Sequence, residues 1–145
     1  MRDREELDED LPKAIVDSNA KENPLTVAVI DIDDFKDVNE RLGHPVGDKV
    51  LRVVADTVHG AVEGKGEVYR VGGGDEIFVL LPNSSRPEAE AVLERVRLSV
   101  AALNILGLGR EITLSVGAAM FPAAGRDKDS LLKAADHAQR AATGC

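Results

Sequence analysis

Acidic side chains gather at two places in the sequence, each beside an apolar run. Residues 25–30 are followed by Asp31-Ile32-Asp33-Asp34, and residues 68–71 lead through three glycines into Asp75-Glu76. Glycine tolerates the sharp backbone turn of a hairpin and lets a phosphate come close. Carboxylates beside such a turn suit Mg²⁺ held against nucleotide phosphates. Two such clusters therefore suggest a two-metal site for phosphoryl transfer.

The spacing of apolar residues predicts the elements that must position these acids. We expect helices over 4–20, 35–42, 46–62 and 87–103, strands over 25–31, 68–71, 77–81 and 112–120, and a last helix that begins at Asp127 or Asp129. Ser84 or Ser85 is expected to cap the helix over 87–103. The buried stripe of the helix over 46–62 is expected to contain Val50, Val53, Val54, Thr57 and Val58.

The β-α-β-β-α-β order at the centre of this pattern predicts the fold class. It is that of an α/β (α+β) fold with a ferredoxin-like split βαβ sheet and helices packed on it. In that topology the end of the first strand lies beside the hairpin, so Asp31 and Asp75 should meet in space. We expect one domain over 1–145, with an N-terminal helix in 1–22 and a catalytic core over 25–142.

Composition narrows the class of protein. The chain has 145 residues, is 43% hydrophobic and carries a net charge of −8. These values predict a folded domain and argue against binding to duplex nucleic acid, which requires basic patches. Bound Mg²⁺ would still admit a small nucleotide, because the ion inverts the local charge. The single cysteine fits a cytoplasmic location, and the sequence shows neither a signal peptide nor a run that could span a membrane.

Several ordered motifs resemble those of the GGDEF-domain family. Residues 31–40 resemble D-x-D-x-F-K-x-x-N-D, residues 43–48 resemble G-H-x-x-G-D, and residues 73–77 resemble G-G-D-E-F itself. Residues 114–118 are similar to the later T-x-S-I-G-V strand, and Ala135-Asp136 to an A-D pair near the end of the family pattern. The resemblance covers nearly the whole chain.

The resemblance implies a fold similar to class III nucleotidyl cyclases and polymerase palms. It also implies a diguanylate cyclase that condenses two GTP molecules into cyclic di-GMP with release of pyrophosphate. Each domain of the family holds one GTP, so catalysis would require a homodimer with its two sites face to face. The implied cofactor is Mg²⁺ or Mn²⁺, two ions per active site.

The same resemblance assigns roles to individual residues. Asp31, the Ile32 carbonyl and Asp75 would bind metal, and Asp75 and Glu76 would be catalytic. Glu76 would deprotonate or orient the attacking ribose hydroxyl, or share a metal. The residues implied to contact the nucleotide are Phe35, Lys36, Asn39, Asp48, Gly73 and Gly74. Asn39 and Asp48 would read the donor edge of guanine, which adenine lacks.

Simpler roles compete with some of these assignments. Asp33 and Asp34 are expected to cap the helix that begins near Phe35 rather than to bind metal. Asp48 could instead cap the helix over 46–62, and His44 is expected to have a structural role in a turn.

The chain also departs from the family pattern. Val71 stands where an arginine is usual and Arg70 lies one residue earlier, which turns its side chain to the opposite face of a strand. Thr143 stands where a phosphate-binding lysine is expected, and Arg140 one turn away could replace it. The segment 64–67 lacks the R-x-x-D of the family's inhibitory product site, which predicts no feedback inhibition there.

Two other functions stay open. One is a minimal cyclase, similar to CRISPR-type polymerases, that makes a cyclic dinucleotide or oligonucleotide from ATP; Asn39 and Asp48 argue against adenine. The other is a degenerate GGDEF module that binds nucleotide without catalysis. The intact Asp31, Asp75 and Glu76 argue against it, because such a module has no physical need for paired carboxylates.

Overall fold

The computed structural model describes residues 1–71, 75–105 and 108–143. The elements are α1 (Arg4–Lys21), β1 (Leu25–Ile32), α2 (Phe35–Leu42), α3 (His44–Val62), β2 (Glu67–Val71), β3 (Glu76–Pro82), α4 (Arg86–Ala101), β4 (Leu114–Phe121) and α5 (Lys128–Thr143). Their order is the predicted one, and their ends differ from the predicted ends by a few residues. None of the described helices combines the length and the apolar character needed to cross a bilayer.

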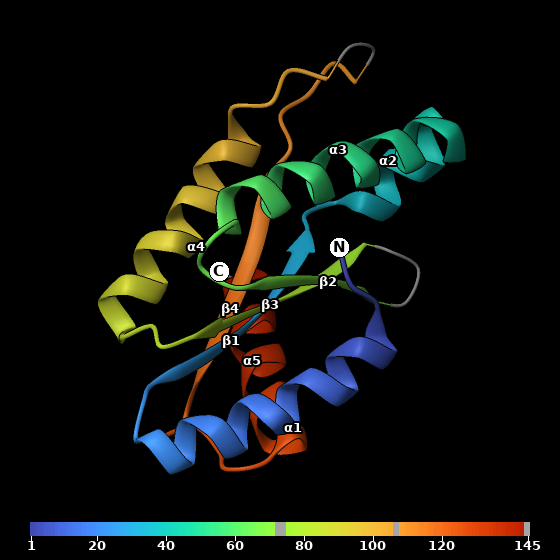
Figure 1. The fold of residues 1–145 in the computed structure, drawn as a ribbon. Helices are drawn as coiled ribbons and strands as arrows, with labels where there is room; N and C mark the ends of the chain where they lie inside the picture. Colours follow the sequence, from blue (N-terminus) through green and yellow to red (C-terminus); the bar gives the residue numbers. More distant parts are fainter. Residues whose placement is uncertain (72–74, 106–107, 144–145) are drawn as a thin grey trace.

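The four strands form one antiparallel sheet in the order β2-β3-β1-β4 (Figure 1). This order confirms the ferredoxin-like split βαβ fold, because β3 lies between β1 and β2 and β1 lies between β3 and β4. In this register Asp31 lies opposite Glu76 on one neighbour and opposite Ser115 on the other. The central strand therefore brings its acidic end against both neighbouring strands.

Helices cover both faces of the sheet, α3 and α4 on one and α1 and α5 on the other (Figure 1). Side chains of β1 alternate between the two cores: Ala28 and Ile30 belong to the α3 and α4 side, and Val27 and Val29 to the α1 and α5 side. Asp31 has the same parity as Val29, so its carboxylate lies on the α1 and α5 face.

Side-chain caps define where three helices begin. Asp3 and Glu6 form a capping box at α1, and Ser85 and Glu88 form another at α4. The second confirms Ser85 as the cap predicted there. At α5, Oδ1 of Asp127 accepts a hydrogen bond of 2.8 Å from the backbone N–H of Ser130, so Asp127 rather than Asp129 opens this helix.

The buried stripe of α3 differs in part from the predicted one. Val50, Val54 and Val58 are buried as expected, but Val53 and Thr57 are only partly buried. They lie on the flank of the stripe, and the hydroxyl of Thr57 donates a 2.8 Å hydrogen bond to the Val53 carbonyl. The other buried residues of α3 are Gly47, Leu51, Ala55 and Val62.

Candidate active site

Asp31 and Glu76 form the centre of an acidic cluster at one end of the sheet. They are register partners on adjacent strands, and both side chains are partly buried. Burial, followed by the charges of Asp75, Asp33 and Asp136, raises the pKa of Asp31 above its ordinary value, although the backbone N–H of Ile32 opposes the shift. The cluster therefore concentrates negative charge that a cation would relieve.

Glu76, on the neighbouring strand β3, is affected by the same cluster of negative charges. Burial raises its pKa most, and the charges of Asp136, Asp31 and Asp75 add to this effect, while Arg4 opposes it. A carboxylate whose pKa is raised is a stronger base than an ordinary glutamate. The predicted meeting of the two acidic segments is thus observed, with Glu76 as the direct partner of Asp31 and Asp75 as the next residue along the hairpin.

The donor set fits a divalent ion that is shared with a substrate. Within residues 1–71, 75–105 and 108–143, no three His, Cys, Asp or Glu side chains are grouped as a metal site. Mg²⁺ is usually bound in proteins by one or two carboxylates together with substrate phosphates, rather than by a full cage of side chains. Asp31, Asp75 and the Ile32 carbonyl are oxygen donors of the kind that this mode requires.

The glycines of the hairpin lie outside the described residues. The prediction that Gly73 and Gly74 contact phosphate through their backbone N–H groups falls on this segment. Arg70, shortly before it in β2, is partly buried and pairs with Ile77 of β3.

The expectation that Asp33 and Asp34 cap α2 is wrong. Oδ2 of Asp33 accepts a 2.7 Å hydrogen bond from the Thr113 hydroxyl, and Oδ1 accepts one of 2.5 Å from the Ser115 hydroxyl. Asp34 occupies the N-cap position at φ 58°, but its side chain makes no capping hydrogen bond. A capping side chain normally needs extended backbone at this position, so the left-handed turn explains the difference. The hydroxyls of Thr113, just before β4, and of Ser115, in β4, draw Asp33 toward the sheet instead.

The nucleotide-binding candidates on α2 and α3 lie together. A Cβ added at Gly47 would lie 1.7 Å from Oδ1 of Asn39 and 3.5 Å from Cζ of Phe35. The Asn39 side chain therefore packs directly on the α3 backbone at Gly47. The next residue of α3, Asp48, is exposed. Because α3 already begins at His44, Asp48 is inside the helix and does not cap it.

Two cations named by the family resemblance, Lys36 and Arg140, are paired with acidic neighbours on their own helices. The side chain of Lys36 is 90% exposed, with a single 3.9 Å contact to Glu40. On α5, Nε of Arg140 lies 3.0 Å from Asp136, whose charge helps to raise the pKa of Glu76 and of Asp31. Thr143, where a lysine is usual, ends the described part of the chain.

Sequence reasoning missed four residues that the structure places in or beside this site. They are Thr113 and Ser115, which hold Asp33, Gly47, which admits Asn39, and Asp136, which adds charge to the cluster. Each lies within or next to a motif that the resemblance contains, but a motif alone does not show which side chains touch.

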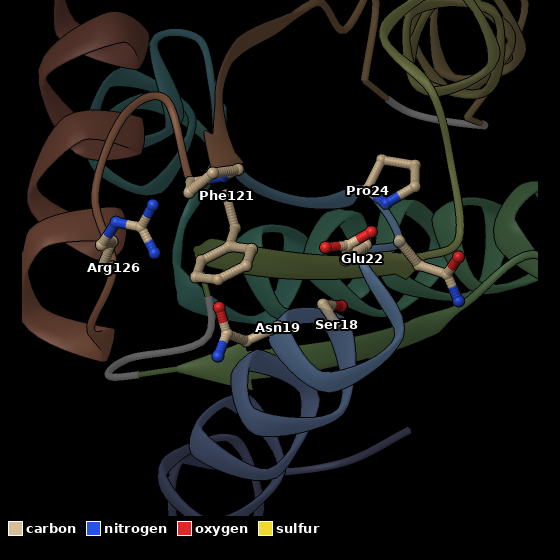
Figure 2. Close-up of a pocket in the computed structure, with 8 residues that line it drawn as sticks. Ser18, Asn19, Glu22, Pro24, Phe121 and Arg126 are labelled. Carbon is tan, nitrogen blue, oxygen red and sulfur yellow. The ribbon is translucent and has the colours of Figure 1, made fainter.

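A pocket of about 500 Å³ lies at the opposite end of the sheet (Figure 2). It is formed by the end of α1, the following turn and the segment after β4, with Ser18, Pro24, Phe121 and Arg126 among its lining residues. Leu25 and Phe121 are register partners there, at the other end of β1 from Asp31. The pocket is therefore separate from the acidic cluster.

Comparison with known proteins agrees with this geometry. Residues 1–143 match the family model described as diguanylate cyclase, GGDEF domain. Diguanylate cyclase DosC of Escherichia coli (strain K12) is 35% identical over 129 residues, which are 87% of this chain and 28% of that protein. Diguanylate cyclase A of Treponema denticola is 36% identical over 123 residues, which are 83% of this chain and 33% of that protein. The chain thus spans about a third of the length of these relatives.

Solved structures give the same result. The GGDEF domain of YfiN, also named TpbB, from Pseudomonas aeruginosa has a TM-score of 0.93 at 33% identity, covering 99% of this chain and 91% of that one. The coiled coil and GGDEF domain of DgcB from Caulobacter crescentus, in complex with c-di-GMP, has a TM-score of 0.86 at 28% identity, covering 98% of this chain and 76% of that one. The chain therefore belongs to the family of diguanylate cyclase GGDEF domains.

Proposed function

We propose that this chain condenses two molecules of GTP into cyclic di-GMP with release of pyrophosphate. The observation that carries the proposal is the pairing of Asp31 with Glu76 across adjacent strands, with Asp75 on the same hairpin. The relatives named as diguanylate cyclases and the c-di-GMP-bound neighbour support the choice of reaction. A reducing cytoplasm, where GTP and Mg²⁺ are present, is the proposed location.

The chain's own residues would bind and orient one GTP. The exposed carboxylate of Asp48 accepts from the donor edge of guanine, and the Asn39 amide both donates and accepts there. Lys36 has the freedom to leave Glu40 for a phosphate. Phe35 and Asn39 both lie close to Gly47 of α3, so Phe35 would help to hold the Asn39 amide in place.

Glu76 would act on the attacking group. The ribose 3′-oxygen of one GTP forms a bond to the α-phosphorus of the other, the bond from that phosphorus to the bridging oxygen breaks, and pyrophosphate leaves. The hydroxyl proton passes to Glu76, whose raised pKa suits a base. Two divalent ions held by Asp31, Asp75 and the Ile32 carbonyl would neutralise the phosphates and lower the pKa of that hydroxyl. A second cycle of the same step closes the ring.

One experiment tests this function against its alternatives. The purified chain is incubated with Mg²⁺ and GTP, ATP or both, and the products are resolved by mass spectrometry. Cyclic di-GMP from GTP alone supports the proposal. A cyclic product that contains adenine supports the ATP-dependent cyclase instead, and bound nucleotide without product at high protein concentration supports a degenerate module.

The matched variants are Asp75→Asn and Asp56→Asn. Asp75→Asn removes one metal ligand and should lower the rate by roughly a hundredfold or more. Asp56 is exposed on α3, away from the acidic cluster, so its substitution should leave the rate unchanged. Equal activity of Asp75→Asn and the unmodified chain would contradict the assigned site.

A further inference from the structure

The turn between β1 and α2 separates two groups of proposed nucleotide-site residues. Asp31 and Ile32 precede it, and Phe35 and Lys36 follow it. Asp34 in the turn adopts left-handed backbone at φ 58° and makes no side-chain capping bond. Left-handed backbone is less favourable for aspartate than for glycine, so contacts from elsewhere would stabilise the turn.

Arg110 supplies such contacts from the segment between α4 and β4. One terminal nitrogen of its guanidinium lies 2.7 Å from Oδ2 of Asp37, and the other lies 3.5 Å from Oδ2 of Asp34. The guanidinium holds its donors in a rigid fork, so one side chain fixes the N-cap residue relative to the first turn of α2. The Arg110 side chain is 34% exposed, whereas that of Arg86, in an ordinary pair on α4, is 80% exposed.

The other carboxylate oxygen of Asp37 accepts a hydrogen bond from a residue of the same helix, α2. Nε of Arg41 lies 2.8 Å from Oδ1 of Asp37. Arg110 and Arg41 lower the pKa of the Asp37 carboxyl, Arg110 most, so both contacts are charge-assisted. Arg41 is one turn away and supports only α2, while Arg110 is 73 residues distant in sequence and joins two segments.

We propose that Arg110 is a positioning residue for nucleotide binding, which holds the β1–α2 turn and the start of α2 in the shape that receives the triphosphate. It acts through Asp34 and Asp37 and is not itself a catalytic residue. The inference rests on the proposed function, because that function places the nucleotide against this turn.

Nucleotide affinity gives the first test. Binding of a fluorescent GTP analogue with Mg²⁺ is measured for the unmodified chain and for Arg110→Ala, Arg110→Lys and Arg86→Ala. Loss of the guanidinium should weaken binding roughly threefold, because the ion pairs through which Arg110 acts are partly exposed to solvent. KM for GTP should rise more than kcat falls. Arg110→Lys should retain part of the affinity, because lysine supplies a single point charge. Arg86→Ala should leave the affinity for the nucleotide unchanged.

Amide hydrogen exchange gives a second test that requires no nucleotide. Arg110→Ala should accelerate exchange in residues 34–38 relative to Arg86→Ala, while exchange in the core strands stays the same. Unchanged exchange in this segment, or unchanged affinity in Arg110→Ala, would overturn the proposal. If the unmodified chain binds no guanine nucleotide, the proposed function fails and the exchange result still decides whether Arg110 orders the turn.

Discussion

Tyr69 is the only tyrosine of the chain, and its hydroxyl is tied to the N-terminal helix. The side chain is fully buried, and the hydroxyl donates a 2.8 Å hydrogen bond to Oδ2 of Asp10 on α1. Burial, then this hydrogen bond and the charge of Asp10, raises the pKa of Tyr69 well above its ordinary value. A single residue thus joins α1 to β2, the strand that leads into the hairpin of Asp75 and Glu76.

Tyr69→Phe should therefore destabilise the fold at neutral pH and remove one source of alkaline sensitivity. We expect the free energy of unfolding to fall by about 1.5 kcal/mol, as for a hydrogen bond to a charged acceptor. Because the folded pKa is raised, the contribution of Tyr69 is fully present below the unfolded pKa of about 10 and is lost as pH rises above it. Urea unfolding at neutral and alkaline pH should show the gap between the two proteins narrowing.

The spectrum provides the control for this pH effect. With no other tyrosine and no tryptophan, tyrosinate absorbance reports Tyr69 alone. As the pH is raised, the tyrosinate absorbance should appear only when the chain unfolds. Titration near the ordinary tyrosine pKa in the folded protein would contradict the assignment.

At the scale of elements, the contact between α2 and α3 depends on a glycine. A Cβ at Gly47 would collide with the Asn39 amide, which is a side-chain end that can turn away, whereas a Cβ at Gly60 of the same helix meets nothing within 4 Å. Both positions are helical, so alanine at Gly60 should stabilise α3 by up to about 1 kcal/mol, whereas at Gly47 the displacement of Asn39 offsets part of that gain. The two sites should differ only in what happens to Asn39.

Gly47→Ala should therefore keep or raise the melting temperature while weakening the binding of GTP. Displacing Asn39 removes one of the two groups proposed to read guanine, and we expect roughly a tenfold loss of affinity for GTP with little change for ATP. Gly60→Ala is the matched control and should bind GTP normally. Full GTP affinity in Gly47→Ala would show that Asn39 does not read the base.

At the scale of the whole molecule, hydrophobic spacing was sufficient to predict the fold. The apolar run that forms β1 and the periodic apolar residues of the helices predict a sheet covered by helices. The ferredoxin-like order of the strands then places Asp31 beside the hairpin. What could not be predicted depends on distant contacts. The sequence does not show that Thr113 and Ser115 bind Asp33, because these groups are 80 and 82 residues apart and a local cap is the simpler expectation.

The position of the acidic cluster, together with the proposed reaction, also predicts a homodimer. The cluster around Asp31 and Glu76 lies at one end of the sheet, and the proposed reaction joins two nucleotides of which each copy holds one. A single copy would then contain half of the reacting groups, so the proposed reaction predicts that two copies meet face to face.

Specific activity should accordingly depend on protein concentration. In a dilution series with saturating GTP and Mg²⁺, the rate per chain should rise with concentration and level off where sedimentation shows a dimer. Adding excess Asp75→Asn, which retains Asn39 and Asp48, the residues proposed to read the base, should lower the activity of the unmodified chain by forming mixed dimers. Asp56→Asn added in the same excess should contribute its own activity instead. A constant rate per chain from a sedimenting monomer would mean that one copy holds both nucleotides, and would overturn the face-to-face arrangement.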